Sequence, residues 1–173
     1  MREGWALWVT GLPASGKSSL TNALIDKLHG LGVNVQVLES DSVRKVLTPE
    51  PTYSPEERDR FYQSLVYIGG LLTSNGVNVI FDATANKRRW RNAARKTVMR
   101  FMEVFVDTPL SVCKMRDPKG IYEAAEKGDA QHVPGEQDKY EEPVDAEVEV
   151  DGTKPPETNA KIIIEVMKAN GFI

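Results

Sequence analysis

Short stretches of the chain are continuously apolar, or alternate between apolar and polar residues, as β-strands do. Trp5 to Val9 (WALWV) is continuously apolar and is followed by a glycine, which predicts a buried central strand. Val33 to Ser40 (VNVQVLES) alternates and predicts a second strand. Three further strands are predicted at Val77 to Asp82, Met102 to Asp107 and Ala146 to Val150.

Between these stretches the apolar residues return at helical spacing. Ser54 precedes a proline and stands three residues before Glu57, which is the signature of a helix start, and Asn75-Gly76 ends that helix. Shorter helices are predicted over 109–115 and 155–170. A further helix follows the first strand, with this apolar face: Leu20, Ala23, Leu24, Leu28 and Leu31. Strands that alternate with helices predict an α/β fold with a mostly parallel five-stranded sheet and helices on both faces.

One segment, Arg116 to Pro143, breaks this alternation with glycine, proline and charge, and contains only a short helix-like piece near 121–126. We expect it to form a mobile lid over a site. The 173 residues are otherwise expected to form a single domain, 1–173. Cys113 is the only cysteine, which excludes an intrachain disulfide and predicts a small core residue.

Composition narrows the function further. The formal net charge of −3 argues against a nucleic-acid partner. No apolar run approaches the roughly 18 residues of a membrane span, so no membrane partner is expected. The N-terminus runs directly into a glycine-rich loop without room for a cleavable signal, which predicts a cytoplasmic protein.

That loop matches the pattern G-x-x-x-x-G-K-[ST] between the first strand and the first helix. Backbone N–H groups of such a loop surround phosphate oxygens, and the positive end of the helix faces the anion. Lys17 is predicted to reach the β- and γ-phosphates, and the Ser18 hydroxyl to ligate Mg²⁺. The sequence therefore predicts an ATP site with Mg²⁺ as cofactor, formed by nine residues: Gly11, Leu12, Pro13, Ala14, Ser15, Gly16, Lys17, Ser18 and Ser19.

A small-molecule kinase fits this chain better than the other classes that use such a loop. A GTPase would need Asn-Lys-x-Asp, and the nearest match, NKRR at Asn86, lacks the aspartate. In kinases, a lid brings arginines over the transferred phosphoryl group and excludes water. Asp41 follows the second strand at the edge where open α/β sheets bind ligands, where a carboxylate could bind the acceptor hydroxyl, hold a magnesium-bound water or cap a helix. A nucleotide-binding module without catalysis is the alternative class.

Five motifs, in order and spacing, resemble the adenylylsulfate kinase family over nearly the whole chain. They are GLPASGKSSL, ESDSVRKVL, YSPEER, RDPKGIY and PGEQDKYEEP. The resemblance implies a phosphate-loop kinase fold that uses ATP and Mg²⁺. It also implies an activity, phosphorylation of the 3′-hydroxyl of adenosine 5′-phosphosulfate to 3′-phosphoadenosine 5′-phosphosulfate, a step of sulfate assimilation.

Carried over by position, the resemblance implies a role for each motif. Asp41 would be the catalytic carboxylate, beside the catalytic Lys17. Arg116 and Asp117 would serve the ATP side. The acceptor would be bound by four residues, namely Arg44, Tyr53, Arg58 and Lys119. A basic series also matches the family and lies on a helix expected after the third strand: Arg88, Arg91 and Arg95. We expect most of these side chains to form a solvated basic face.

The chain departs from the family pattern in the acceptor half. Contacts are missing at Phe61, Gln63 and Ser64, and the lid has Val133 where the family has phenylalanine. The stretch FDAT, ending the third strand, resembles a broader group of kinases in which the aspartate, here Asp82, supports Mg²⁺. The metal ligands are therefore predicted among Ser18, Asp41 and Asp82, and the alternative function is a related kinase acting on another alcohol or on a nucleotide or polynucleotide hydroxyl. Family members often form homodimers, and 61–72 is apolar enough for a core or a dimer face.

Overall fold

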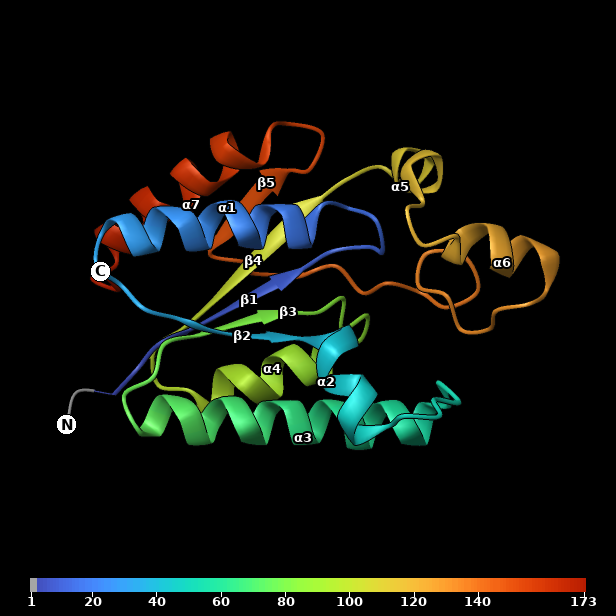
Figure 1. Ribbon diagram of the computed structural model, residues 1–173, viewed down its shortest axis with the longest axis horizontal. Helices are drawn as coiled ribbons and strands as arrows, with labels where there is room; N and C mark the ends of the chain where they lie inside the picture. The colour runs from blue at the N-terminus through green and yellow to red at the C-terminus, as the bar shows by residue number, and fades with distance from the viewer. Residues whose placement is uncertain (1–2) are drawn as a thin grey trace.

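The computed structural model describes residues 3–173 and contains a five-stranded sheet in which every strand pairing is parallel. The strand order is β2-β3-β1-β4-β5, so the first strand lies at the centre of the sheet (Figure 1). The predicted strands are confirmed, with these bounds: β1 Ala6–Thr10, β2 Gln36–Glu39, β3 Val79–Asp82, β4 Phe101–Asp107 and β5 Val148–Asp151. All loops that leave the carboxyl ends of these strands therefore meet at one edge of the sheet.

Helices cover both faces of the sheet, as predicted (Figure 1). On one face lie α1 (Lys17–Gly30) and α7 (Pro156–Ala169), which pack together over a cluster that includes Leu24 and Ile163. On the other face lie α3 (Pro55–Ser74) and α4 (Arg88–Thr97), over a cluster rich in aromatic rings in which Trp8 stacks on Phe81. Burial of these two apolar layers holds the sheet between the helices.

The start of α3 forms as its sequence predicts. The Ser54 hydroxyl accepts a hydrogen bond from the backbone N–H of Glu57 (3.2 Å), and Pro55 occupies the first turn, where its missing N–H costs nothing. Farther along α3 the apolar stretch buries Phe61 and Leu65 but exposes Tyr67 and Leu71, one turn apart. A homodimer through this face stays a prediction.

One helix was not predicted. The chain enters α2 (Ser40–Leu47) directly after β2, and Asp41 lies in its first turn. The second strand is accordingly shorter than the alternating stretch 33–40 that predicted it. Because α2 begins where β2 ends, Asp41 lies at the same edge of the sheet as the phosphate loop.

Helix α5 (Leu110–Arg116) leads into the segment 116–143, which the sequence predicted as a lid and which contains α6 (Ile121–Lys127) and otherwise mostly irregular chain; its mobility stays a prediction. Cys113 of α5 is buried, as predicted, in a small cluster with Tyr122, Ala125 and Val133 of the lid segment. Part of the phosphate loop packs against the same cluster, so the lid has a small core shared with that loop. Within 3–173, no helix combines the length and apolar character that a membrane crossing requires.

The expectation of a solvated basic face on α4 is wrong for Arg91. Its side chain is fully buried, its Nε donates to Glu103 on β4 (2.6 Å), and its Nη2 donates to the backbone carbonyl of Glu141 (2.6 Å). Arg95 also bonds to Glu103 and to Glu147 of the chain before β5. A buried carboxylate needs a cationic partner, so these arginines neutralise Glu103, and neither of them lines the main cavity described below.

We expect Arg91→Met to lower the free energy of unfolding by about 3 kcal/mol, because Glu103 and the backbone carbonyls of Ala85 and Glu141 lose a donor. Thermal and urea unfolding would measure the change. Arg89→Ala is the control: Arg89 on the same helix pairs with Asp59 (2.6 Å) but is largely exposed, so its loss should cost less than about 1 kcal/mol. Equal losses for the two variants would contradict a structural role for the buried pair.

Candidate active site

The phosphate loop joins β1 to α1 and depends on two glycines. Gly11 has φ +157°, and a Cβ there would lie 2.7 Å from the Ser15 hydroxyl oxygen. Gly16 has φ +104° directly before the first residue of α1, Lys17. Because no residue with a side chain fits these positions comfortably, the glycines fix the path by which the loop's N–H groups turn toward a phosphate.

Lys17 crosses the loop that it belongs to. Its Nζ donates to the carbonyls of Gly11 (3.2 Å) and Leu12 (2.8 Å), and burial lowers the pKa of its ammonium group. Those carbonyls belong to the loop itself, so the ammonium can turn to a phosphate oxygen without breaking a contact elsewhere in the protein. This is the position predicted for a group that bridges β- and γ-phosphates.

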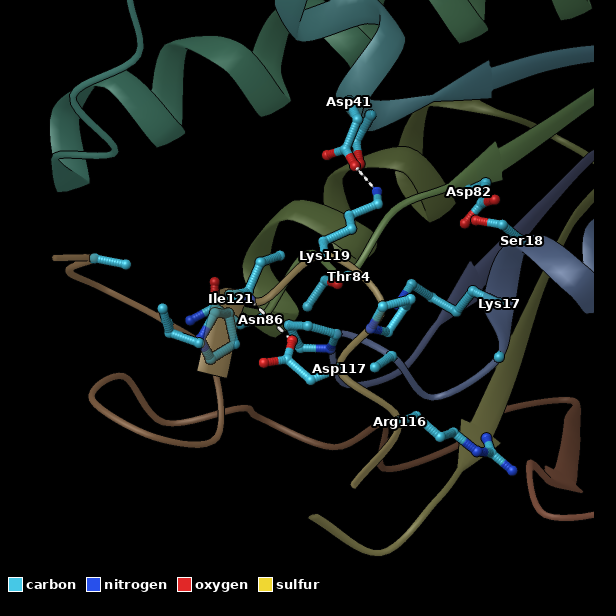
Figure 2. A pocket seen from close by; sticks show the side chains of 18 of the residues that line it. Lys17, Ser18, Asp41, Asp82, Thr84, Asn86, Arg116, Asp117, Lys119 and Ile121 are labelled. Carbon is cyan, nitrogen blue, oxygen red and sulfur yellow. Dashed lines mark hydrogen bonds and ion pairs between the residues drawn. The ribbon is translucent and has the colours of Figure 1, made fainter. Parts of the chain in front are cut away.

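Asp82 and Ser18 lie together beside the loop (Figure 2). Asp82 ends β3 and is buried, which raises the pKa of its carboxyl group, while Lys17 and a hydrogen bond from Ser18 act in the opposite direction. Mg²⁺ prefers oxygen ligands, and proteins commonly supply only one or two carboxylates and leave the remaining positions to water and substrate phosphates. Residues 3–173 contain no cluster of three or more His, Cys, Asp or Glu suited to a metal, but a hydroxyl and a carboxylate suffice for such a site.

Asp41 lies across the site from Asp82 and has a different environment. Its side chain is more than half exposed and forms an ion pair with Lys119, which extends toward it from the segment between α5 and α6 (Figure 2). The sequence placed Asp41 among the candidate metal ligands, whereas the structure gives it a lysine partner. Asp41 and Lys119, two residues predicted to serve the acceptor, are thereby brought into contact.

A cavity of about 1020 Å³ connects all these groups. Its walls come from the phosphate loop, the ends of β2 and β3, the start of α3, and the lid. The predicted site residues that line it include Lys17, Ser18, Asp41, Arg44, Tyr53, Arg58, Asp82, Arg116, Asp117 and Lys119. One cavity therefore combines most of the predicted phosphate-loop residues with the predicted acceptor-binding residues, whereas Gly11, Leu12 and Ser15 of the loop do not line it.

On the nucleotide side, Arg116 ends α5 and its Nη1 donates to the carbonyls of Gly152 (3.0 Å) and Ser15 (3.3 Å). Asp117 lines the cavity but uses its carboxylate within the lid, where it accepts hydrogen bonds from the N–H groups of Ile121 (2.8 Å) and Glu123 (3.0 Å). These bonds cap the first turn of α6. Asp117 therefore shapes the lid at the edge of the nucleotide site.

On the opposite side, the buried Arg44 and the half-buried Arg58 gather around aromatic rings. The Arg44 guanidinium lies 3.8 Å from the centre of the Phe61 ring and 5.0 Å from that of Tyr53, and pairs with Glu57 (3.0 Å). The Arg58 guanidinium lies 5.7 Å from the Tyr53 ring. Contact with aromatic rings orients both guanidinium groups, whose planar geometry suits a planar or tetrahedral anion.

Arg58 is also bound to the lid. Its Nη2 donates to the carbonyl of His132 (2.6 Å) and its Nη1 to Asp138 (3.3 Å), whose other oxygen lies 3.3 Å from the His132 ring. The sequence did not predict that His132 and Asp138 would reach the acceptor side. Both lie in the irregular part of the lid, where no periodic pattern of apolar residues indicates which way a side chain faces.

Comparison with known proteins agrees with this geometry. The family model for adenylylsulphate kinase matches residues 3–151. The chain belongs to the adenylylsulfate kinase family. A probable adenylyl-sulfate kinase of Pyrococcus abyssi is 38% identical over 172 residues, which is 99% of each chain. The adenylyl-sulfate kinase of an Escherichia coli strain is 34% identical over 173 residues, covering 99% of this chain and 86% of the relative.

Solved structures of the family have the same fold. The APS kinase of Mycobacterium tuberculosis in complex with AMPPNP and APS superposes with a TM-score of 0.91 at 31% identity, over 97% of this chain and 99% of that one. A shikimate kinase from Aquifex aeolicus, at 17% identity and a TM-score of 0.56, shares the fold alone. The chain is thus an adenylylsulfate kinase family member on a scaffold common to small-molecule kinases.

The departures from the family pattern have a simple structural outcome in this member. The Phe61 ring packs against the Arg44 guanidinium. Gln63 is exposed, and the Ser64 hydroxyl donates to a backbone carbonyl of its own helix. None of the three lines the cavity. The sequence also missed Lys154 and Asn159, which line the nucleotide end just beyond β5.

Proposed function

We infer that this adenylylsulfate kinase family member transfers the γ-phosphoryl group of ATP to the 3′-hydroxyl of adenosine 5′-phosphosulfate. The observation that carries this inference is the single cavity in which a complete phosphate loop faces Arg44, Arg58 and Tyr53. An acceptor that carries both an aromatic base and a dianionic phosphosulfate matches an aromatic ring flanked by two arginines. Family membership supplies the acceptor's identity.

The loop side supplies the charge that phosphoryl transfer requires. The backbone N–H groups of the loop, which Pro13 lacks, and the Lys17 ammonium would hold the β- and γ-phosphates. We assign Ser18 and Asp82 to Mg²⁺, because they are adjacent and offer oxygen atoms beside the loop. When bound, the ion neutralises charge that develops between these phosphates.

Asp41 would orient the acceptor hydroxyl and accept its proton. Its carboxylate projects from the first turn of α2 on the acceptor side and pairs with Lys119. A carboxylate in this position can accept a hydrogen bond from the acceptor hydroxyl and take up its proton. We therefore propose separate roles for the two aspartates, with Asp82 serving the metal and Asp41 the hydroxyl.

The cations on the acceptor side already have protein partners. Arg44 pairs with Glu57, Arg58 with Asp138 and Lys119 with Asp41. An incoming phosphosulfate must bind the donors that these pairs leave free, or exchange with a carboxylate. Replacing a carboxylate partner is favourable only when the incoming anion accepts several hydrogen bonds from the arginines at once. This favours a dianionic acceptor over a neutral alcohol.

The activity is tested by offering several acceptors in parallel with ATP and Mg²⁺. Adenosine 5′-phosphosulfate should be phosphorylated fastest, ahead of AMP, an RNA with a 5′-hydroxyl end and simple polyols. Product formation by chromatography, with ADP release as a second measure, gives kcat/KM for each. Faster turnover of any other acceptor would overturn the assignment while leaving the kinase class intact.

Arg58→Ala is expected to raise the KM for adenosine 5′-phosphosulfate about 10- to 100-fold, because a charge-assisted hydrogen bond is worth about 1.5–3 kcal/mol. The KM for ATP should change less than about twofold, since Arg58 lies on the acceptor wall. Arg60→Ala is the matched control, because Arg60 is on the same helix but exposed. A parallel rise in both KM values would show that Arg58 only supports the lid.

A further inference from the structure

The lid and the phosphate loop are packed together over a continuous surface. Leu12 and Ala14 of the loop contact the lid cluster formed by Cys113, Tyr122, Ala125 and Val133. Gly135 approaches so closely that a Cβ in its place would lie 2.7 Å from a Leu12 methyl carbon. The loop is thus supported by lid residues from outside the cavity as well as by its own backbone.

A tyrosine hydroxyl from α6 holds the middle of the loop. Tyr122 is almost fully buried and its hydroxyl donates to the carbonyl of Pro13 (2.9 Å). The next residue, Ala14, has φ +61°, a left-handed conformation that is unfavourable for a residue with a side chain. Since the Pro13 carbonyl belongs to the peptide group that leads into Ala14, the Tyr122 hydrogen bond fixes the orientation of this strained unit.

A second tyrosine hydroxyl holds the entrance to the loop. The Thr10 hydroxyl donates its one proton to the carbonyl of Thr84 (2.7 Å), so the Tyr140 hydroxyl, 2.8 Å from the same oxygen, must be the donor to Thr10. Burial raises the pKa of the Tyr140 phenol to about 12, which keeps that proton in place at neutral pH. Thr10 is the last residue of β1 and directly precedes Gly11.

The chain around Tyr140 is itself firmly attached. The Asn86 side chain donates to the carbonyl of Lys139 (3.1 Å), and the Glu141 N–H donates to the carbonyl of Asn86 (2.8 Å). The Arg91 guanidinium lies 5.6 Å from the centre of the Tyr140 ring. Through its hydrogen bond to Thr10, Tyr140 therefore ties the start of the loop to a segment that is itself held by hydrogen bonds.

We propose that Tyr122 and Tyr140 are positioning residues that clamp the phosphate loop from the lid and set its N–H groups for the β-phosphate of the nucleotide. Neither residue lines the cavity, so neither touches ATP or the acceptor. The proposal deepens the proposed function, since it rests on this loop binding a nucleotide. It also gives a role to two tyrosines of the lid motifs that bond to the loop and its preceding strand without lining the cavity.

The test compares the affinities of two ligands in Tyr122→Phe and Tyr140→Phe by calorimetric titration of the whole protein. Phenylalanine keeps the ring packing and removes only the hydroxyl. Each variant should bind ADP about 5- to 10-fold more weakly, corresponding to the loss of one buried hydrogen bond. Affinity for adenosine 5′-phosphosulfate should stay within about twofold. Tyr67→Phe, which alters an exposed hydroxyl on α3, should change neither affinity.

Equal weakening of both ligands would overturn the proposal, because it would mean that the hydroxyls merely stabilise the lid. Unchanged ADP affinity in both variants would overturn it as well. A wild-type protein that binds ADP but not adenosine 5′-phosphosulfate would refute the proposed acceptor instead. In that case the role of the tyrosines would be tested by ADP affinity alone, measured well below each variant's Tm. Weaker ADP binding by a fully folded variant would support their role in positioning the loop.

Discussion

Replacing Lys17 by alanine is expected to lower kcat/KM for ATP by about 100-fold or more while the protein stays folded. Lys17 contributes its charge where the bridge between β- and γ-phosphates becomes more negative, and electrostatic terms of this kind dominate phosphoryl transfer. Among the described residues its hydrogen bonds go to two carbonyls of its own loop, so the substitution breaks no hydrogen bond between elements. Steady-state kinetics together with thermal unfolding would separate the two effects.

Lys27→Ala provides the control for this substitution, because Lys27 lies on the same helix in its last turn, far from the loop. Its kinetics should match those of the unmodified protein. Near-normal turnover by Lys17→Ala would mean that the loop serves the structure and that the phosphate is held elsewhere.

Replacing Asp41 by asparagine should reduce kcat about 100-fold and leave the affinity for ATP nearly unchanged. General-base assistance contributes roughly 10²- to 10⁴-fold, and an amide cannot accept the proton. The ion pair with Lys119 is largely exposed, so its loss should barely alter stability. Single-turnover measurements with saturating ATP would isolate the chemical step from binding.

Asp82→Asn is the informative companion, since this carboxylate lies beside Ser18 and the phosphate loop. Its main effect should be a higher Mg²⁺ concentration for half-maximal activity. If Asp41→Asn retained its kcat, and Asp82→Asn lowered kcat even at saturating Mg²⁺, the roles assigned to the two aspartates would have to be exchanged.

Much of this arrangement could be predicted because it is encoded locally. The glycine loop, the buried strand before it and the cap at Ser54 each depend on a few adjacent residues, and all appear where expected. Parallel strands place their carboxyl ends together, which is why Asp41 and Asp82 could be assigned to one edge in advance.

Features that depend on distant partners could not be predicted in this way. Arg91 is buried because Glu103 lies on the strand beneath it, and a glutamate within an otherwise apolar strand was the one available signal. The direction of His132 and Asp138 depends on Arg58, which is far away in the sequence. Helix α2 is short and polar, so no apolar periodicity marked it.

The central place of β1 in the sheet has a consequence for how the protein folds during synthesis. Ala6 pairs with Val79 on one side and with Phe101 on the other, so the first strand made must wait for both partners. Pairings between residues so far apart in the chain carry a large loop-closure cost and slow the folding reaction. The phosphate loop, which continues from that strand, can therefore reach its binding geometry only after β4 has left the ribosome, and a nascent chain that ends before Phe101 should not retain ADP.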